Sequence, residues 1–133
     1  MRIIHKAALA VFQNQKLLMV RAARYPEVLL TLGGTIELNE TDQICIKRET
    51  WEEITAQVEP STLLFLHEFT GAAYAKTDAQ VLVRLYQGTL LNTPTPASEI
   101  DLIEYVDSTI DRTRLTDVGK KIIDWLKQEK YIN

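Results

Sequence analysis

The sequence has little cysteine, no long apolar run and no surplus of basic charge. Cys45 is the only cysteine in 133 residues, so no internal disulfide forms, and its apolar surroundings predict a small core residue. No apolar stretch approaches the ~20 residues of a membrane span, and the segment MRIIHKAALAVF lacks a signal-peptide cleavage site. The net charge of −3 argues against a nucleic-acid polymer as partner. We therefore expect a cytoplasmic, soluble protein without a membrane partner.

The length and composition are those of an ordinary globular domain. Hydrophobic residues make up 46% of the chain and charged residues 25%. A chain of this size buries a sizeable core without disulfides or a structural metal. Neither a repeat nor a linker divides it. The sequence therefore predicts a single domain spanning residues 1–133.

Hydrophobic patterning and breakers indicate how the chain is organised. The expected elements are strands at 3–12 and 16–21, a loop at 22–31, a break at Gly33–Gly34, a helix at 41–56 with Thr41 as N-cap, strands at 61–69 and 79–88, a loop at 92–96, a strand at 99–106, and a helix at 117–129. Strands separated and closed by helices indicate a mixed α/β (α+β) fold. We expect an α/β/α sandwich, with the mixed sheet between helices on its two faces.

The most informative feature is a cluster of acids beside a glycine pair. Five glutamates fall within seventeen residues, and they are Glu37, Glu40, Glu49, Glu52 and Glu53. On a helix the last three lie three and four positions apart, so they share one face, where like charges repel. Ile44 and Trp51 lie on the opposite side and are expected to be buried. The acidic face needs a cation, which either Arg48 or a hard divalent ion such as Mg²⁺ could provide.

The spacing of these residues resembles a known family. From Gly34 to Ala56 the chain follows the Nudix box, G-x5-E-x7-R-E-U-x-E-E-x-G-U, where U is a bulky apolar residue. The first glycine, the arginine and all four glutamates of the box match. The order of strands and helices also resembles the Nudix domain over nearly the whole chain. A glutamate-rich helix alone is more often a solvated surface, but the full spacing is much more specific.

Several positions depart from the pattern. Thr50 stands where an apolar residue is usual, and Ala56 is a small version of the last apolar position. Thr55 replaces the glycine that ends the helix in a left-handed conformation, which a β-branched residue disfavours. We therefore expect the helix to continue to Gln57. Asn39 replaces a frequent glycine and tolerates the left-handed region.

The resemblance implies the roles of the site residues. Glu52 and Glu53 would be the principal ligands of Mg²⁺ or Mn²⁺, and Glu49 would be either a further ligand or the general base. A backbone carbonyl of Gly33 or Gly34 would complete the coordination, and Arg48 would orient the glutamates. The loop acids that precede the helix, Glu37 and Glu40, would hold the loop in place.

Four residues outside the box are weaker candidates. In some Nudix enzymes the general base lies on a later loop, where this chain has Glu99 and Asp101. A solvent-exposed position at the start of a strand explains either acid more simply. Arg21 and Arg24 precede the glycine pair and could contact substrate phosphates, although surface arginines are common.

The implied activity is hydrolysis of a phosphoanhydride bond in a nucleoside diphosphate linked to another moiety, so the expected partner is a nucleotide-type small molecule. Small members of the family often act on nucleoside triphosphates, which favours release of a monophosphate and pyrophosphate. The alternative is a non-catalytic sensor or scaffold module that binds a nucleotide. The oligomeric state stays open, and related domains often form homodimers.

Overall fold

The computed structural model describes residues 1–133 and contains seven strands, two α-helices and two short 3-10 helices. The elements are β1 (Arg2–Ala10), β2 (Phe12–Gln13), β3 (Lys16–Ala22), β4 (Leu30–Thr35), α1 (Asp42–Ile54), a 3-10 turn (Pro60–Thr62), β5 (Leu64–Ala72), β6 (Ala79–Gln87), β7 (Ile100–Val106), a 3-10 turn (Arg112–Arg114) and α2 (Asp117–Gln128). Neither α-helix combines the length and the apolar run that a bilayer crossing requires.

The strands form one mixed sheet in which β4 joins two parts. The order is β2-β3-β4-β1-β6-β5, and β7 pairs with β3 outside this path. Strands β1 and β6 run parallel along their full lengths, and the other pairs are antiparallel. The first residues of β4 pair with β3 and the later ones with β1. The sheet therefore splays around β4, the strand that leads into the acid-rich segment.

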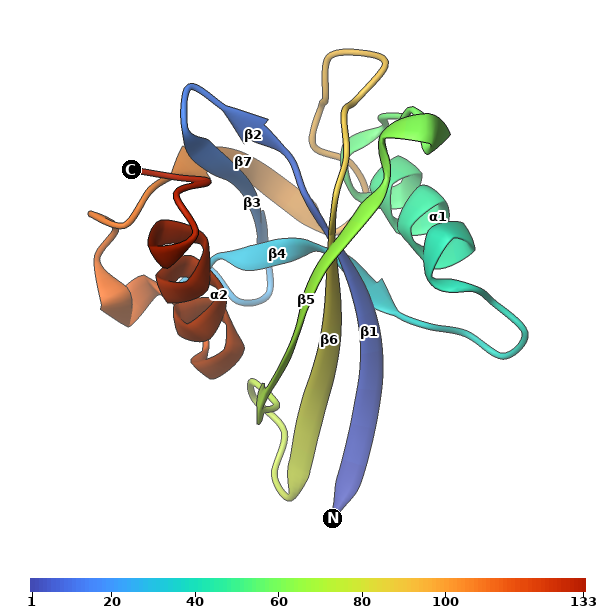
Figure 1. The fold of residues 1–133 in the computed structure, drawn as a ribbon. Coiled ribbons are helices and arrows are strands. Elements are labelled where there is room, and N and C mark those ends of the chain that lie inside the picture. Colours follow the sequence, from blue (N-terminus) through green and yellow to red (C-terminus); the bar gives the residue numbers. More distant parts are fainter.

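Alternation along β1 separates two hydrophobic cores. Ala8 and Ala10 face one core with α2, whereas Ala7 and Leu9 face the other with α1. Figure 1 shows the two helices on opposite sides of the strands. The predicted sandwich with a mixed sheet between helices is confirmed.

Three sequence expectations about the strands need correction. Residues 30 and 31, expected in a loop, begin β4, and Gly33–Gly34 continue this strand instead of breaking it. The later strand expected at 61–69 lies at Leu64–Ala72, because Pro60–Thr62 forms a 3-10 turn. In β4 the glycines are sites of close approach rather than chain breaks, a role that local propensity does not distinguish.

Helix α1 buries a different side from the one expected. Ile44 and Trp51 are 52% and 53% exposed, so the prediction that they form the buried side is wrong. The buried positions on α1 include Cys45, Ile46 and Ile54, which confirms Cys45 as a core residue. Glu53 falls on the same side as Ile46, seven residues earlier, since seven residues make about two turns. The helix therefore turns Glu53 toward the protein interior.

The end of α1 also differs from the expectation. The helix stops at Ile54, and Thr55 adopts the left-handed conformation with φ 51° and ψ 41°, so the predicted continuation to Gln57 is wrong. The loop after β6 accounts for this, because its Asn92 side chain donates to the Thr55 carbonyl at 3.0 Å and accepts from the Gln57 N–H at 2.9 Å. These tertiary hydrogen bonds outweigh the unfavourable energy of a β-branched residue in the left-handed conformation.

The N-terminal ends of both helices match the sequence patterns. Thr41 Oγ1 accepts from the Ile44 N–H at 3.2 Å, and Thr116 Oγ1 accepts from the Gly119 N–H at 3.1 Å. Asp42, in the first turn of α1, accepts two hydrogen bonds from Arg84 and one from the Tyr86 hydroxyl. The start of α1 is thereby fixed to β6.

Candidate functional site

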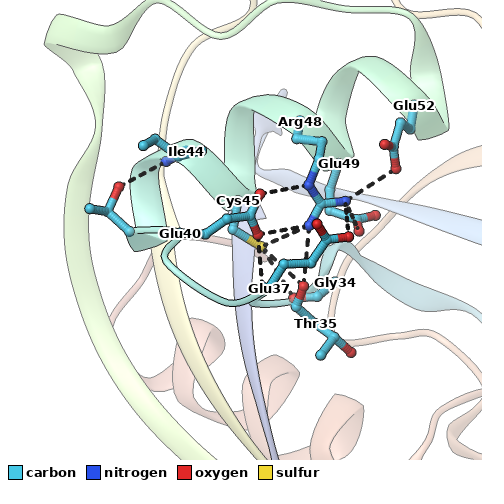
Figure 2. A network of polar contacts seen from close by, with 10 residues as sticks. Gly34, Thr35, Glu37, Glu40, Ile44, Cys45, Arg48, Glu49 and Glu52 are labelled. Atoms are coloured by element: carbon cyan, nitrogen blue, oxygen red, sulfur yellow. Dashed lines mark hydrogen bonds and ion pairs between the residues drawn. The ribbon is translucent and has the colours of Figure 1, made fainter.

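Arg48 is the centre of the polar network on α1. Its Nε and Nη2 donate to Glu40 at 2.7 and 2.9 Å, and Nη1 donates to Glu49 at 2.8 Å and to Glu52 at 3.3 Å. Nη2 also donates to the Thr35 carbonyl at 3.2 Å, which connects the helix to the end of β4. Figure 2 shows these acids arranged around the guanidinium. Arg48 therefore compensates part of the acidic cluster and orients its carboxylates.

The loop between β4 and α1 is closed by its own acids. Glu40 accepts from the Glu37 N–H at 2.8 Å as well as from Arg48, and Asn39 between them adopts φ 67°. The hydrogen bond from Arg48 lowers the pKa of Glu40 to about 2. The Glu37 carboxylate lies 3.7 Å from Arg48 and is mostly exposed. Ionised Glu40 thus stabilises the loop through its hydrogen bonds, and the Glu37 side chain lies at the outer edge of the loop.

Glu53 lies in a different electrostatic environment. No arginine or lysine forms an ion pair with it, and its one hydrogen bond comes from the Gly33 N–H at 2.9 Å. Burial raises the pKa of Glu53 to about 8, against the lowering effect of that hydrogen bond. Burial also raises the pKa of Glu49, despite the opposing effect of Arg48. Two partly buried carboxylates therefore stand close together with incomplete compensation.

The glycine pair allows the strand to pass against these acids. A Cβ on Gly33 would lie 2.2 Å from the Ala7 carbonyl oxygen, and Gly33 has φ 132°. A Cβ on Gly34 would lie 2.5 Å from the carboxyl carbon of Glu49. The lack of a side chain at both positions leaves room for backbone and carboxylate oxygens on one surface.

A cavity of about 300 Å³ opens beside this surface. Glu49, Glu53, Gly33 and Gly34 line one part of it. Another part is lined by Lys6 on β1, by Arg24 and Tyr25 after β3, and by Tyr74 and Lys76 in the loop between β5 and β6. The two tyrosine rings pack edge to face with centroids 5.4 Å apart. The cavity thus combines carboxylates, cations and an aromatic wall.

The structure separates the other candidate residues by location. Glu99 lines the cavity, whereas Asp101 accepts a hydrogen bond from Arg21 at 2.9 Å, and neither Asp101 nor Arg21 lines the cavity. Arg24 lines it and lies 3.8 Å from Glu99. Glu52 is half exposed at the outer side of the network, held by Arg48. Among the outlying candidates, only Glu99 and Arg24 lie with the acids of α1.

The carboxylates do not form a preassembled metal cage. No group of three or more histidine, cysteine, aspartate or glutamate side chains converges as ion ligands. Arg48 lies between Glu40, which its Nε binds, and Glu49 and Glu52, which its Nη1 binds. The pair that faces the cavity, Glu49 and Glu53, is the part of the cluster with room for a cation.

The cationic and aromatic residues that line the cavity were not predicted from the sequence, apart from Arg24. Lys6 is a charged residue within the apolar strand β1, a pattern that was visible in the sequence. Burial and the nearby Lys76 ammonium lower the pKa of Lys6. Tyr25, Tyr74 and Lys76 lie in loops and carry no distinguishing spacing, so only the fold brings them together.

Comparison with family models matches residues 3–126 to the NUDIX domain. Comparison with curated protein sequences finds no significant match. The family match spans the glycine pair, the α1 acids and almost all of α2.

Solved structures share the fold at low sequence identity. A MutT NUDIX hydrolase from Burkholderia pseudomallei matches with a TM-score of 0.77 and 15% identity, over 93% of this chain and 98% of that one. The Escherichia coli dihydroneopterin triphosphate pyrophosphohydrolase gives a TM-score of 0.72 and 13% identity, over 97% and 99%. A bifunctional NMN adenylyltransferase/ADP ribose pyrophosphatase from Francisella tularensis, complexed with AMP and a Mn ion, gives 0.67 and 20%, over 96% of this chain and 42% of that one.

Proposed function

This chain belongs to the NUDIX domain family, a family of hydrolases that act on phosphoanhydrides, and we propose that it is a divalent-metal-dependent pyrophosphohydrolase. Its substrate would be a nucleoside diphosphate linked to another group, and we favour a nucleoside triphosphate that is cleaved to a monophosphate and pyrophosphate. The observation that carries the proposal is the pair Glu49 and Glu53, which face one cavity beside Gly33 and Gly34.

The residues present fit a hard divalent cation. Glu53 is partly buried and forms no salt bridge, and burial raises the pKa of both acids. Mg²⁺ and Mn²⁺ prefer oxygen ligands, and Mg²⁺ is commonly held by one or two carboxylates together with substrate phosphates. Glu49 and Glu53 would hold the ion, with a Gly33 or Gly34 carbonyl and Glu52 as further ligands. When bound, the ion would neutralise phosphate oxygens and lower the pKa of a coordinated water.

The protein's own groups would position the substrate and move a proton. Arg48 holds Glu49 and Glu52 through its Nη1 atom, so the acids keep one arrangement when the substrate enters. We propose Glu99 as the general base outside the helix, in preference to Asp101. Glu99 lines the cavity, whereas Asp101 is paired with Arg21 outside it. A Glu99 carboxylate oxygen would accept the proton of the attacking water.

The aromatic and cationic lining of the cavity suits a nucleotide. Arg24 lies over the Tyr25 ring at 5.0 Å and would contact a phosphate, and we do not assign Arg21 this role because Asp101 occupies its guanidinium. Tyr25 and Tyr74 form an apolar wall against which a base or sugar could pack. Glu27 holds Tyr74 in place by accepting a hydrogen bond from its hydroxyl.

The non-catalytic alternative rests on the unusual residues Thr50 and Thr55. Thr50 is fully buried and Thr55 ends α1 at the position where the box has glycine. Neither substitution displaces Glu49 or Glu53 from the cavity. We therefore favour the enzyme.

A nucleotide panel tests the proposed function. The protein would be incubated with nucleoside triphosphates, nucleotide sugars, dinucleoside polyphosphates and ADP-ribose, each with Mg²⁺, Mn²⁺ or a chelator. We expect metal-dependent release of a nucleoside monophosphate from at least one class, and its loss in Glu53→Gln. The matched control is Glu129→Gln, which neutralises an exposed acid after α2. Saturable nucleotide binding without turnover, under every metal condition, would instead support the sensor.

A further inference from the structure

Two of the three cations that line the cavity form no salt bridge. Lys6 projects from the middle of β1, on the strand face shared with Ile4, and Lys76 lies in the loop between β5 and β6. Both line the cavity that Glu49 and Glu53 line. Neither lysine forms an ion pair anywhere in the structure. Burial and the Lys76 ammonium lower the pKa of Lys6, and together they outweigh the opposing attraction of Glu53 and Glu49.

This arrangement is unfavourable in the free protein. Two like charges repel, and a partly buried ammonium also loses part of its hydration. Arg24, the third cation of the cavity, interacts with Glu99 at 3.8 Å and with the Tyr25 ring, so it is partly compensated. Lys6 is also attracted by Glu53 and Glu49, but a metal ion bound to these acids would offset that attraction. Both lysines would then be available to an anion, which would relieve their repulsion.

The cavity therefore has two groups of charges that a ligand could compensate. The negative charges of Glu49 and Glu53 would be compensated by a metal ion, which would also bind the substrate diphosphate. The positive charges of Lys6 and Lys76 would be compensated by a further anionic group. A nucleoside diphosphate linked to a neutral sugar has no such group once its two phosphates bind the metal. A nucleoside triphosphate carries three phosphates, so one remains after two engage the metal site.

We infer that Lys6 and Lys76 form a subsite for a third phosphate, and that this subsite makes the enzyme select nucleoside triphosphates over nucleoside diphosphates linked to a neutral sugar. The inference rests on the proposed function for its catalytic consequence. The subsite itself is a property of the two lysines and is testable without turnover.

The kinetic test compares two substrates that share a nucleoside, UTP and UDP-glucose. We expect Lys6→Met and Lys76→Met each to reduce kcat/KM for UTP by about tenfold or more, because a hydrogen bond to a charged group is lost. For UDP-glucose we expect a change of less than about twofold. Lys127→Met removes an exposed lysine of α2 and should change neither value. An equal fall for both substrates, or no fall for UTP, would overturn the inference.

Two further variants separate charge from structure. Lys76→Arg keeps the charge in an exposed loop and should retain most of the preference for UTP. Lys6→Met should melt at the wild-type temperature or above it, because it removes a repulsion and a desolvated charge. A clear fall in its melting temperature would assign Lys6 to structural compensation of Glu49 and Glu53 and would count against the subsite.

A binding measurement keeps the inference distinct from the proposed function. Inorganic tripolyphosphate would be titrated calorimetrically into metal-free protein in a chelating buffer. We expect binding that weakens with salt and falls at least tenfold in the Lys6→Met/Lys76→Met double variant. If the wild-type protein hydrolyses no nucleotide but binds tripolyphosphate through both lysines, the proposed function fails and the subsite stands. If it hydrolyses nucleotides and the double variant binds tripolyphosphate normally, the subsite fails alone.

Discussion

Helix α2 buries Ile122, Ile123 and Leu126 against the sheet, whereas helix α1 combines buried Cys45 and Thr50 with a side that carries Glu49 and Glu53. Outside its apolar face, α2 keeps its charges in solvent, as in the Arg112–Asp124 pair. The two helices cover opposite faces of the same sheet (Figure 1). Of the two, α1 is the helix whose carboxylates Glu49 and Glu53 are partly buried.

The difference indicates where stability and chemistry are located. Apolar burial along α2 contributes folding free energy directly, at about 25 cal/mol per Å². Along α1, burial of carboxylates and of an unpaired hydroxyl opposes folding. A region that keeps unfavourable groups in a fixed arrangement is typical of a functional site. Substitution of the α1 acids that face the cavity should therefore lower activity without lowering stability, and substitution of the buried apolar residues of α2 should do the reverse.

The largest expected effect on α1 follows from Glu53→Gln. Turnover should fall about 10²–10⁴-fold, because the amide is neutral and is a poor ligand for a divalent cation. The fold should survive, since the glutamine side chain can still accept the hydrogen bond from Gly33. Steady-state kinetics on the best panel substrate and thermal unfolding would be measured together. Turnover within twofold of the wild type would show that Glu53 has no role in the chemistry. It would also contradict the assignment of catalysis to α1 and of stability to α2.

The corresponding substitution on α2 is Ile123→Ala. Ile123 is 1% exposed and packs in the core on the far side of the sheet. Its truncation should lower the free energy of unfolding by about 2–5 kcal/mol, through lost burial and the cavity that remains. Urea denaturation measures this change, and kcat should stay near the wild-type value at temperatures where the variant is folded. A selective loss of kcat in folded Ile123→Ala would show that α2 also sets the geometry of the site.

The part of the site that lies on α1 could be predicted from the sequence, because the periodicity of a helix is the same in any surroundings. The spacing of Arg48, Glu49 and Glu53 determines how these side chains project from α1, whatever surrounds the helix. The order of elements and the helix caps at Thr41 and Thr116 depend on equally local patterns. The sandwich was predictable for the same reason.

The remaining features depend on contacts between distant segments. Lys6 and Lys76 line one cavity because β1 pairs in parallel with β6, which follows the loop that carries Lys76. Thr55 ends α1 because Asn92 binds its carbonyl from another loop. The exposure of Trp51 follows from the side on which α1 docks, which the composition of the helix alone did not determine.

The glycine pair permits a sharper test inside the site. Gly33→Ala should lower the free energy of unfolding by about 1–3 kcal/mol from backbone strain alone, with more from the contact with the Ala7 carbonyl. Gly34→Ala should cost less stability, because its Cβ meets the end of the Glu49 side chain, which can shift, whereas the Cβ of Gly33→Ala meets backbone atoms. That displacement should reduce kcat more than it reduces stability. Denaturation and kinetics on both variants give the comparison, and equal stability losses would contradict the distinction.

The smallest expected effect is a gain in stability from Thr50→Val. Thr50 is fully buried, and its hydroxyl is the one buried side-chain polar atom without a hydrogen-bond partner. Valine has nearly the same shape and no hydroxyl to desolvate, so the free energy of unfolding should rise by about 1 kcal/mol. Thr50 does not line the cavity, so turnover should not change.

The matched control for Thr50→Val is Thr116→Val, which removes a buried hydroxyl that caps α2 through the Gly119 N–H. It should lower the free energy of unfolding by about 1 kcal/mol. Opposite signs at two buried threonines, measured by urea denaturation, would show that α1 keeps an unfavourable polar group where α2 keeps a satisfied one. A loss of stability in Thr50→Val would mean that its hydroxyl has a partner, and the difference between the two helices would then reduce to their carboxylates.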